Sequence, residues 1–389
     1  MDISTETIDH LAHLARLEFK GVEKAGIKAD LEKIIGFMDK LREIDTKDVE
    51  PLIFMSEEVN RLREDLPQIT ITHEEALRNA PKKDSDYFVF QKYWISKVKV
   101  SGFTFIRNAL KYDYPIVEAI QSILPICDEF IIAVGNSEDE TLALIQKINT
   151  QKIKIIQTVW DDSLRDNGKV LAIETNKAFA EISSDSDWAF YIQGDEVVHE
   201  KYLNSIQLTM QKYALDYEVD GLLFDYKHFY GSYDFIGSSN SWYKKEIRII
   251  RNNKQIYSFK DAQGFRKGAN EKLKVVSANA SIYHYGWVKD PRSMQFKQED
   301  FNKLWHNDEW ISKNIEIAEV FEYEKHISQL SRFDGDHPLV MKDRIQRLNW
   351  KFDYDISKNK RSFKDFLKDS LLLIGLNFNY KNYFFLRRK

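Results

Sequence analysis

The sequence predicts an α/β fold in which a parallel sheet with flanking helices follows a small, mostly helical segment. Strand-like and helix-like stretches alternate between residues 94 and 290, a pattern typical of parallel sheets. Residues 1–90 show helical apolar periodicity instead. The chain has 389 residues, more than one hydrophobic core usually supports, so we expect two or more domains.

Composition indicates an ordinary soluble globular protein, with 43% apolar and 30% charged residues and a net charge of −4. That charge does not indicate a dedicated nucleic-acid binder, although residues 1–90 are acidic and residues 356–389 are basic. The single cysteine, Cys127, cannot form an internal disulfide and follows an apolar stretch, which favours a buried, unreactive thiol. The first ten residues lack an apolar signal region, and no run of 18 apolar residues occurs, so we expect a cytoplasmic protein.

The first ninety residues predict two amphipathic helices and an extended arm. Ser4 precedes the first helical pattern, and residues 31–41 carry the second. Pro51 favours an extended path, and Thr72 and Glu75 stand at capping-box spacing before a short helix. Such a segment has little core of its own, so its apolar stripes need a partner surface. We therefore expect a subunit rather than an enzyme.

Catalytic or metal-binding groups are not evident in this segment. His10 and His13 lie three positions apart, but no third ligand is placed to join them, so flanking polar residues of a helix are the simpler interpretation. A Gly/Ser-rich nucleophile loop, which an amidase needs, is missing from the sequence of residues 1–90.

The stretches HLAHLARLEF, VEPLIFMSEEVNRLRED and EEALRNAP…DYF resemble the C subunit of the bacterial aspartyl/glutamyl-tRNA amidotransferase over residues 1–90. The resemblance implies a non-catalytic clamp that holds the amidase (A) subunit to the tRNA-binding (B) subunit. That complex converts Glu-tRNA(Gln) or Asp-tRNA(Asn) to the amide, and its other subunits use ATP and glutamine. The contacts that the resemblance implies are Leu14, Ala15, Arg16, Leu17, Pro51, Leu62, Arg63, Glu64 and Asp65.

The elements of residues 94–290 alternate in order along the chain. We expect a strand at KVKV, a helix over FIRNALKYDYPIVEAIQSILPIC, a strand at EFIIAV, a helix at LALIQKI, a strand at KIKIIQTVW, a helix at GKVLAIETNKAFAEI and a strand at WAFYI.

Three polar, acidic turns follow strands of this region, where α/β sheets bind ligands. The turns hold Asn136 to Asp139, Asp161 and Asp162, and Asp195 and Glu196. Carboxylates gathered at one edge repel each other unless cations or polar ligands occupy the site. Each turn alone is also explained by ordinary capping, but the three together favour a ligand site.

Asp195 emerges directly from the apolar run WAFYI, and Glu196 follows it. Carboxylates in this position suit a hard divalent ion that shares its ligand shell with phosphate oxygens. His284 lies at the end of an aromatic-rich strand and is either a further ligand or a structural histidine.

The stretches GNSEDETLALI, DNGKVLAIETNKAFA, FYIQGDEVVHE and IYHYGW resemble family 2 glycosyltransferases over residues 95–290. The resemblance implies a nucleotide-binding fold of the GT-A type, a nucleoside diphosphate sugar and a divalent metal (Mg or Mn). Asp195 matches the second carboxylate of the Asp-x-Asp motif that holds metal and diphosphate, and His284 matches a late histidine that completes the shell. Gln193 replaces the first carboxylate, and Gly135 replaces the Asp that touches the nucleotide.

The reaction that this resemblance implies is transfer of a sugar to an acceptor hydroxyl, for which an inverting route needs a carboxylate base. Asp261 is the candidate base, and a turn-capping role is its alternative. Arg165 and Lys169 could meet the diphosphate, or could be solvated surface residues. The residues expected around the donor are Asn136, Asp139, Asp161, Asp162, Arg165, Lys169, Asp195 and Glu196.

Residues 291–389 are expected to form a helical C-terminal extension. The run LLLIGL is too short to cross a bilayer. The basic and aromatic residues around it could touch an anionic membrane at its inner face, or belong to a terminal helix that packs on the catalytic domain.

Three interpretations of the whole chain stay open at this point. The chain is a fusion of both functions, or a glycosyltransferase whose first ninety residues serve as a protein-interaction module, or two neighbouring genes read as one.

Overall fold

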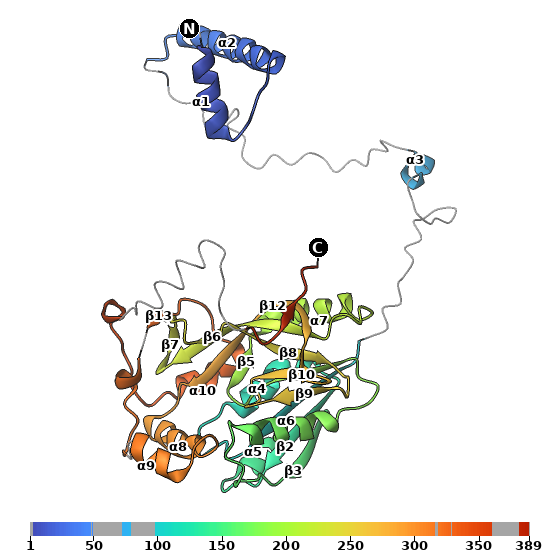
Figure 1. Ribbon diagram of the computed structural model, residues 1–389, viewed down its shortest axis with the longest axis vertical. Coiled ribbons are helices and arrows are strands. Elements are labelled where there is room, and N and C mark those ends of the chain that lie inside the picture. The colour runs from blue at the N-terminus through green and yellow to red at the C-terminus, as the bar shows by residue number, and fades with distance from the viewer. Residues whose placement is uncertain are drawn as a thin grey trace. The chain divides into compact units, whose positions relative to one another are not determined.

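The computed structural model describes residues 3–47, 49, 72–78, 98–315, 318–327, 329–359 and 381–388. The chain divides into two compact units, residues 1–90 (unit 1) and residues 91–389 (unit 2). Figure 1 shows the elements of each unit and labels those for which there is room.

Unit 1 contains the helices that the sequence predicts. They are α1 (Thr5–Ala15), α2 (Val22–Arg42) and α3 (His73–Leu77). Ser4 caps α1 by accepting a 3.1 Å hydrogen bond from the backbone N–H of Thr7. At α3, the backbone N–H of Thr72 donates to Glu75 Oε2 at 2.9 Å and that of Glu75 donates to Thr72 Oγ1 at 3.3 Å. Both predicted caps are confirmed, because each satisfies N–H groups that a helix start leaves unpaired.

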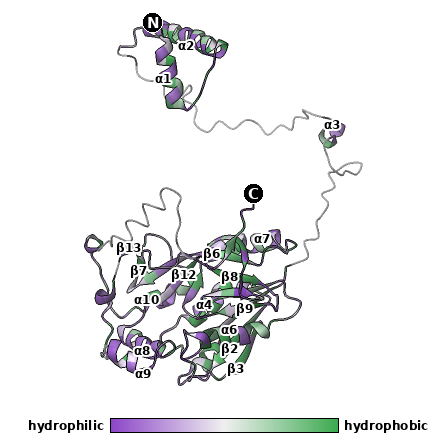
Figure 2. Ribbon diagram, viewed as in Figure 1, coloured by the Kyte–Doolittle hydropathy of each residue, from purple (hydrophilic) through white to green (hydrophobic). Residues whose placement is uncertain are grey.

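The apolar side chains of α1 and α2 are mostly exposed. Figure 2 shows that apolar and polar residues both occur along these helices. Among the described residues of unit 1, the buried apolar side chains are those of Ile3, Ile8 and Leu77. The exposed ones are Leu11, Leu14, Leu17, Val22, Ile34, Phe37, Met38, Leu41, Ile44 and Val49. For the described residues of unit 1, the expectation of little core is therefore confirmed. Pro51 and residues 62–65 of the expected clamp contacts lie outside the described residues.

Unit 2 is built on one large mixed sheet with the order β13-β7-β6-β8-β4-β1-β2-β3, to which β12, β5 and β14 are joined through β6. Its strands are β1 (Val100–Ile106), β2 (Glu129–Gly135), β3 (Ile153–Thr158), β4 (Trp188–Tyr191), β5 (Glu196–Val198), β6 (Gly221–Tyr230), β7 (Ser232–Gly237), β8 (Lys245–Arg251), β12 (Lys274–Trp287), β13 (Leu330–Arg332) and β14 (Phe384–Phe385). A smaller sheet joins β9 (Ile256–Phe259), β10 (Gly264–Lys267) and β11 (Glu271–Lys272).

The half of the sheet that the sequence suggested is parallel, and β12 also pairs parallel with β6 and β14. β3, β2, β1 and β4 run parallel, whereas β4–β8, β8–β6 and β6–β7 pair antiparallel. The reason is the connections: helices join the parallel strands, whereas β6 turns directly into β7 at Gly231, whose φ is 70°. Short connections can join only antiparallel neighbours. The predicted parallel sheet is therefore confirmed for β1 to β4, and the antiparallel strands are an addition that the alternation of strands and helices did not indicate.

Helices cover both faces of the parallel strands. They are α4 (Ile116–Ile123), α5 (Thr141–Gln146), α6 (Lys169–Ala180) and α7 (Leu203–Lys212). Because side chains alternate along a strand, Ile131 of β2 lies in one core with Val170 of α6, and Phe130 lies in the other with Ile120 of α4. Both faces are buried, as expected for parallel strands.

The segment between β1 and α4 differs from the expectation. The sequence predicted a helix from Phe105 onward, but β1 continues to Ile106 and α4 begins only at Ile116. The run of aromatic and β-branched residues prolongs the strand. Asn108 and Asp113 then adopt positive φ angles of 55° and 47°, a conformation that a right-handed helix does not contain. Residues 107–115 (the β1–α4 loop) are therefore a loop at the sheet edge.

The C-terminal region of unit 2 contains more than the expected helical extension. Its helices are α8 (Pro291–Asn302), α9 (Asp308–Asn314) and α10 (Lys342–Gln346). In addition β13 pairs with β7, and β14 pairs with β12, so the region completes the same sheet. No helix among the described residues has the length and apolar character needed to cross a bilayer. The run LLLIGL lies outside the described residues.

Candidate functional site

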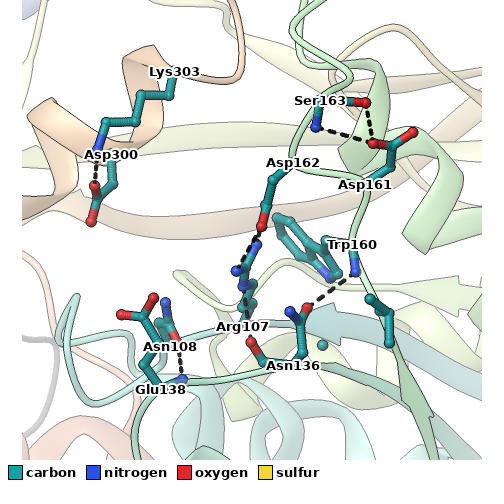
Figure 3. A network of polar contacts seen from close by, with 12 residues as sticks. Arg107, Asn108, Asn136, Glu138, Trp160, Asp161, Asp162, Ser163, Asp300 and Lys303 are labelled. Carbon is teal, nitrogen blue, oxygen red and sulfur yellow. Dashed lines mark hydrogen bonds and ion pairs between the residues drawn. The ribbon is translucent and has the colours of Figure 1, made fainter.

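The carboxyl ends of three parallel strands meet in one polar network (Figure 3). Arg107 follows β1, and its Nε donates a 3.1 Å hydrogen bond to the main-chain oxygen of Asn136, which follows β2. Its Nη2 donates to Asp162 Oδ2, after β3, at 3.2 Å. The side chain of Asn136 accepts from the backbone N–H of Trp160 at 3.1 Å. The structure thus brings Asn136 and Asp162 together and adds Arg107 between them.

This network leaves little free negative charge. The hydrogen bond from Arg107 to Asp162 is the main reason why the pKa of Arg107 is raised, and the pair cancels the charge of one expected carboxylate. The guanidinium carbon of Arg107 lies 5.5 Å from the ring centroid of Trp160, a cation–π distance.

Asp139 holds the backbone of two neighbouring segments. Its carboxylate accepts hydrogen bonds from the backbone N–H groups of Leu110 and Lys111, at 2.9 and 2.8 Å, and from that of Thr141 at 3.1 Å. These bonds fix the β1–α4 loop against the start of α5. The Asp139 carboxylate therefore stabilises the backbone that forms the site.

Asp161, Arg165 and Lys169 lie on the segment between β3 and α6. Asp161 accepts from the hydroxyl and the backbone N–H of Ser163, and these bonds lower the pKa of Asp161. Arg165 forms an ion pair of 2.5 Å with Asp308 of α9. Lys169 is exposed at the first position of α6. Of these three side chains, the geometry leaves only that of Lys169 without an ion-pair or hydrogen-bond partner among the described residues.

Asp261 lies beside the beginning of α6. A Cβ atom placed on Gly168, whose φ is 68°, would stand 2.9 Å from Asp261 Cβ and 2.7 Å from the ring of Trp305. Partial burial raises the pKa of Asp261, which is the direction that a proton-accepting carboxylate requires. The hydrogen bonds and ion pairs of the described residues do not connect Asp261 with Asp195.

Glu196 is fully buried and fully paired. Its Oε1 accepts from Arg248 Nη2 at 2.7 Å and from the Tyr226 hydroxyl at 2.7 Å, and its Oε2 accepts from Arg248 Nε at 2.8 Å and from the backbone N–H of Gln193 at 3.1 Å. Both Glu196 and Arg248 have no exposed side-chain surface. Because its carboxylate already accepts four hydrogen bonds, Glu196 stabilises the structure of the site and does not offer a free ligand.

Asp195 is the carboxylate around which charged groups gather. Its Oδ2 lies 3.5 Å from Lys297 Nζ and 3.7 Å from His284 Nε2. Burial opposes its ionisation, but the charges of His284, Lys297 and Lys289 outweigh burial and lower the pKa of Asp195 to about 2. Gly286 permits this approach, since a Cβ there would lie 2.7 Å from Asp195 Oδ2 and 2.6 Å from the His284 ring. The structure thus brings together Asp195 and His284, which lie far apart in the sequence.

Two lysines from the C-terminal region complete this cluster. Lys297 Nζ donates to the main-chain oxygen of Gly286 at 3.0 Å and lies 5.3 Å from the ring centroid of Tyr114. Lys289 Nζ donates to the main-chain oxygen of Asp113 at 3.0 Å and lies 4.0 Å from the same ring. Tyr114 belongs to the β1–α4 loop, so this loop lies beside both ammonium groups, of which only that of Lys297 comes from α8.

The donor groups around Asp195 do not fit a divalent metal ion. Mg and Mn prefer octahedral oxygen ligands, yet Glu196 is already paired with Arg248. The part of the chain that the structure describes contains no group of three His, Cys, Asp or Glu side chains placed to hold a metal. The residues at Asp195 and His284 therefore do not fit the metal that the resemblance implies.

Glu246 of β8 is another buried carboxyl of unit 2. Glu246 is 6% exposed, and its Oε2 has no hydrogen-bond partner among the described residues. Burial raises the pKa of Glu246 to about 8. The folded protein therefore keeps a proton that the unfolded chain releases near pH 4.5, so this group makes stability fall as the pH rises from about 4.5 to 8.

Glu246→Gln is expected to remove this pH dependence and to exceed the wild type in stability by on the order of 3 kcal/mol at pH 8. Urea unfolding followed by tryptophan fluorescence at pH 5 and pH 8 measures the difference between the two proteins. The buried His228 also contributes to the pH dependence of stability, because burial lowers its pKa. It is present in both proteins, so its contribution cancels in the difference between them. A difference that stays constant with pH would contradict the prediction.

Sequence reasoning missed the basic partners of the site. Arg107, Arg248, Lys289 and Lys297 come from four different segments, and nothing in their local sequence distinguishes them from surface residues. The one available signal was the excess of acidic turns at a sheet edge, which requires compensating cations.

Comparisons with known proteins concern the two units separately. The family model described as Glu-tRNA(Gln) amidotransferase C subunit matches residues 19–89. The C subunit of the aspartyl/glutamyl-tRNA(Asn/Gln) amidotransferase of Cytophaga hutchinsonii is 55% identical over 93 residues, which are 24% of this chain and 98% of that protein. The protein of the same description from Chlorobaculum parvum is 37% identical over 92 residues, 24% of this chain and 97% of that protein.

Among solved structures, S. aureus TarS 1-349 in complex with UDP matches with a TM-score of 0.32 and 15% identity, over 52% of this chain and 64% of that chain. Glucosyl-3-phosphoglycerate synthase from Mycobacterium tuberculosis, in complex with Mn2+, UDP and phosphoglyceric acid, matches with a TM-score of 0.22 and 19% identity, over 34% of this chain and 43% of that chain. This chain thus spans less than two thirds of either solved protein.

Proposed function

Through its N-terminal segment the chain belongs to the family of aspartyl/glutamyl-tRNA amidotransferase C subunits, and from this premise we propose that it joins such a protein to a sugar transferase. Unit 1 is the non-catalytic subunit. It binds the amidase (A) and tRNA-binding (B) subunits and thereby supports the formation of Asn-tRNA(Asn) or Gln-tRNA(Gln). Unit 2 transfers a sugar from a nucleoside diphosphate sugar to an acceptor hydroxyl.

The exposed apolar faces of α1 and α2 support the first function. Leu14 and Leu17 have 67% and 56% of their surface exposed, although each would gain about 1.5–3 kcal/mol from full burial. A partner that covers these helices supplies that gain. Both leucines are among the contacts implied by the resemblance of residues 1–90 to the amidotransferase family.

Leu14→Asp is expected to weaken co-purification of the full-length chain with the A subunit about tenfold or more, because a charge would enter an apolar contact. The matched control is Leu215→Asp, which changes a leucine of unit 2 that is 82% exposed. Equal capture of the two variants would contradict the proposed contact. If the wild type captures neither the A nor the B subunit, unit 1 is an interaction module with another partner.

The single observation that carries the second function is the position of Asp195. It follows β4 at the carboxyl end of the parallel half of the sheet, 12% exposed and beside two lysines. Carboxyl ends of parallel strands are where α/β sheets bind ligands, and paired lysines suit a diphosphate.

The proposed reaction needs one base and one anion-binding site. The acceptor oxygen attacks the anomeric carbon, and the bond from that carbon to the diphosphate oxygen breaks. The electron pair of this bond leaves with the nucleoside diphosphate, and the acceptor proton passes to a carboxylate, for which Asp261 is the proposed residue. The positive groups beside Asp195 stabilise the charge on the leaving diphosphate.

A panel of nucleoside diphosphate sugars tests this function. Incubated with the full-length chain, the correct donor is expected to release its nucleoside diphosphate, with water serving as a slow acceptor when the natural one is missing. Failure of every donor to react or bind would refute the transferase. The size of the native product in cell extract tests the neighbouring-gene interpretation, since the joined chain has a mass of 46.0 kDa. Two smaller species would end the fusion hypothesis.

Contact with a membrane stays a proposal for the basic C-terminal tail. Residues 360–380 form most of this tail and lie outside the described residues. Flotation with anionic liposomes, compared between the full chain and a chain ending at Lys358, measures the contact. No difference between the two would remove the idea.

A further inference from the structure

The charges of the Asp195 cluster do not balance in favour of a cation. The negative charge of the nearby Glu196 is neutralised by Arg248, and the Asp113 carboxylate is paired with Arg344. The remaining carboxylate of the cluster is that of Asp195 itself. It faces Lys297, and Lys289 is a further lysine that acts on it. The carboxylate of Asp195 therefore has the ammonium group of Lys297 as its partner, and burial lowers the pKa of both lysines, most strongly that of Lys289.

The position of Lys297 is fixed by its helix. Lys297 and Asp300 lie on α8, three positions apart and so on one face. Asp300 Oδ2 accepts from the Tyr112 hydroxyl at 2.8 Å and forms an ion pair of 2.9 Å with Lys111. Both partners belong to the β1–α4 loop. This loop therefore holds α8 so that Lys297 reaches Asp195 at the end of β4.

The ammonium group of Lys297 is also held from two sides. It donates to the main-chain oxygen of Gly286 and lies beside Asp195 Oδ2. An ammonium group has three N–H donors, and these two contacts leave one donor for a ligand. The side chain keeps 12% of its surface exposed, the same fraction as that of Asp195, so a diphosphate oxygen could approach it.

We propose that the ammonium group of Lys297, supported by Lys289, takes the place of a divalent metal ion in binding the diphosphate of the sugar donor. This proposal rests on the transferase function proposed above. When the bond to the anomeric carbon breaks, the electron pair goes to the diphosphate oxygen, and Lys297 donates a hydrogen bond to the diphosphate without losing its proton. Asp195 then acts as a positioning residue that holds this ammonium group.

Binding of nucleoside diphosphates to the full-length chain tests the proposal. Isothermal titration calorimetry with uridine, guanosine, cytidine and adenosine diphosphates is done in excess EDTA and in excess Mg or Mn. We expect at least one of them to bind in EDTA with a Kd within about twofold of its value with metal. Lys297→Met is expected to weaken that binding about tenfold or more, whereas Lys297→Arg keeps the charge and retains most of it.

The matched control is Lys313→Met, since Lys313 is an exposed lysine of the neighbouring helix α9. Binding that requires Mg or Mn would overturn the metal-free proposal and leave the transferase standing. Binding to none of the four diphosphates, with or without metal, would overturn both. Unchanged binding by a folded Lys297→Met variant would overturn the role of this lysine. If Lys297→Met does not fold, two measurements still test the proposal. They are the wild-type affinities in EDTA and with metal, and the affinity of Lys297→Arg.

Discussion

Replacing Arg248 with methionine is expected to lower the free energy of unfolding of unit 2 by about 3–5 kcal/mol. Arg248 and Glu196 have no exposed side-chain surface and share two hydrogen bonds of 2.7 and 2.8 Å. Without the guanidinium group, Glu196 would stay in the interior with only the Tyr226 hydroxyl and one backbone N–H as donors. An uncompensated buried charge is among the costliest changes in a folded protein.

Urea unfolding followed by tryptophan fluorescence measures this loss, because all eight tryptophans lie after residue 90 and report on unit 2. The double variant Glu196→Gln with Arg248→Met is expected to recover part of the stability, since it removes the isolated charge. Lys154→Ala is the matched control, as its ion pair with Glu181 is about half exposed and worth at most about 1 kcal/mol. Equal losses in Arg248→Met and Lys154→Ala would contradict the importance of burial.

Asp195→Asn is expected to reduce sugar transfer about a hundredfold or more, a loss typical of removing one preorganised electrostatic group. The amide keeps the shape of the side chain but lacks the charge that holds Lys297 at 3.5 Å and His284 at 3.7 Å. A loss of donor affinity should accompany the loss of turnover. Asp195→Ala, which also removes the side-chain volume, should abolish transfer.

The same substitution has a predicted effect on stability. The pKa of Asp195 is lowered to about 2 from its ordinary 3.8, so its ionised form contributes about 2 kcal/mol above pH 4 and loses it as the pH falls toward 2. Asp185→Asn is the control, because that carboxylate is exposed and pairs with Lys99 at the surface. If Asp195→Asn retains the donor affinity and turnover of this control, Asp195 does not belong to the donor site.

Local signals in the sequence predicted the elements whose partners are near in the chain. The cap at Ser4 and the capping box at Thr72 depend on residues three positions apart, so spacing alone identifies them. The alternation of strands and helices up to β4 likewise indicated the parallel half of the sheet. The helix expected from Phe105 was wrong because Phe105 and Ile106 pair with β2, and the loop that follows contains residues with positive φ angles.

The candidate site was predicted in part for the same reason. Asp195 and Asp162 follow apolar strands, and their place at the sheet edge follows from parallel topology. Their counter-charges do not follow, because Arg107, Arg248 and Lys297 reach them through separate elements of the fold. Pairing through space depends on which strand lies beside which, and β8 joins the sheet next to β4 by antiparallel pairing that the alternation did not indicate.

The sequence by itself determined that two unlike segments share this chain: a coreless helical segment of the amidotransferase type and an α/β unit with acidic turns at one sheet edge. It did so because helix caps, apolar periodicity and strand–helix alternation act over a few residues. Only the tertiary structure decided which charges those turns meet. Glu196 is neutralised by Arg248, Asp162 by Arg107, and Asp195 faces Lys297 from a helix much later in the chain, because electrostatic pairing depends on distance in space and not along the chain.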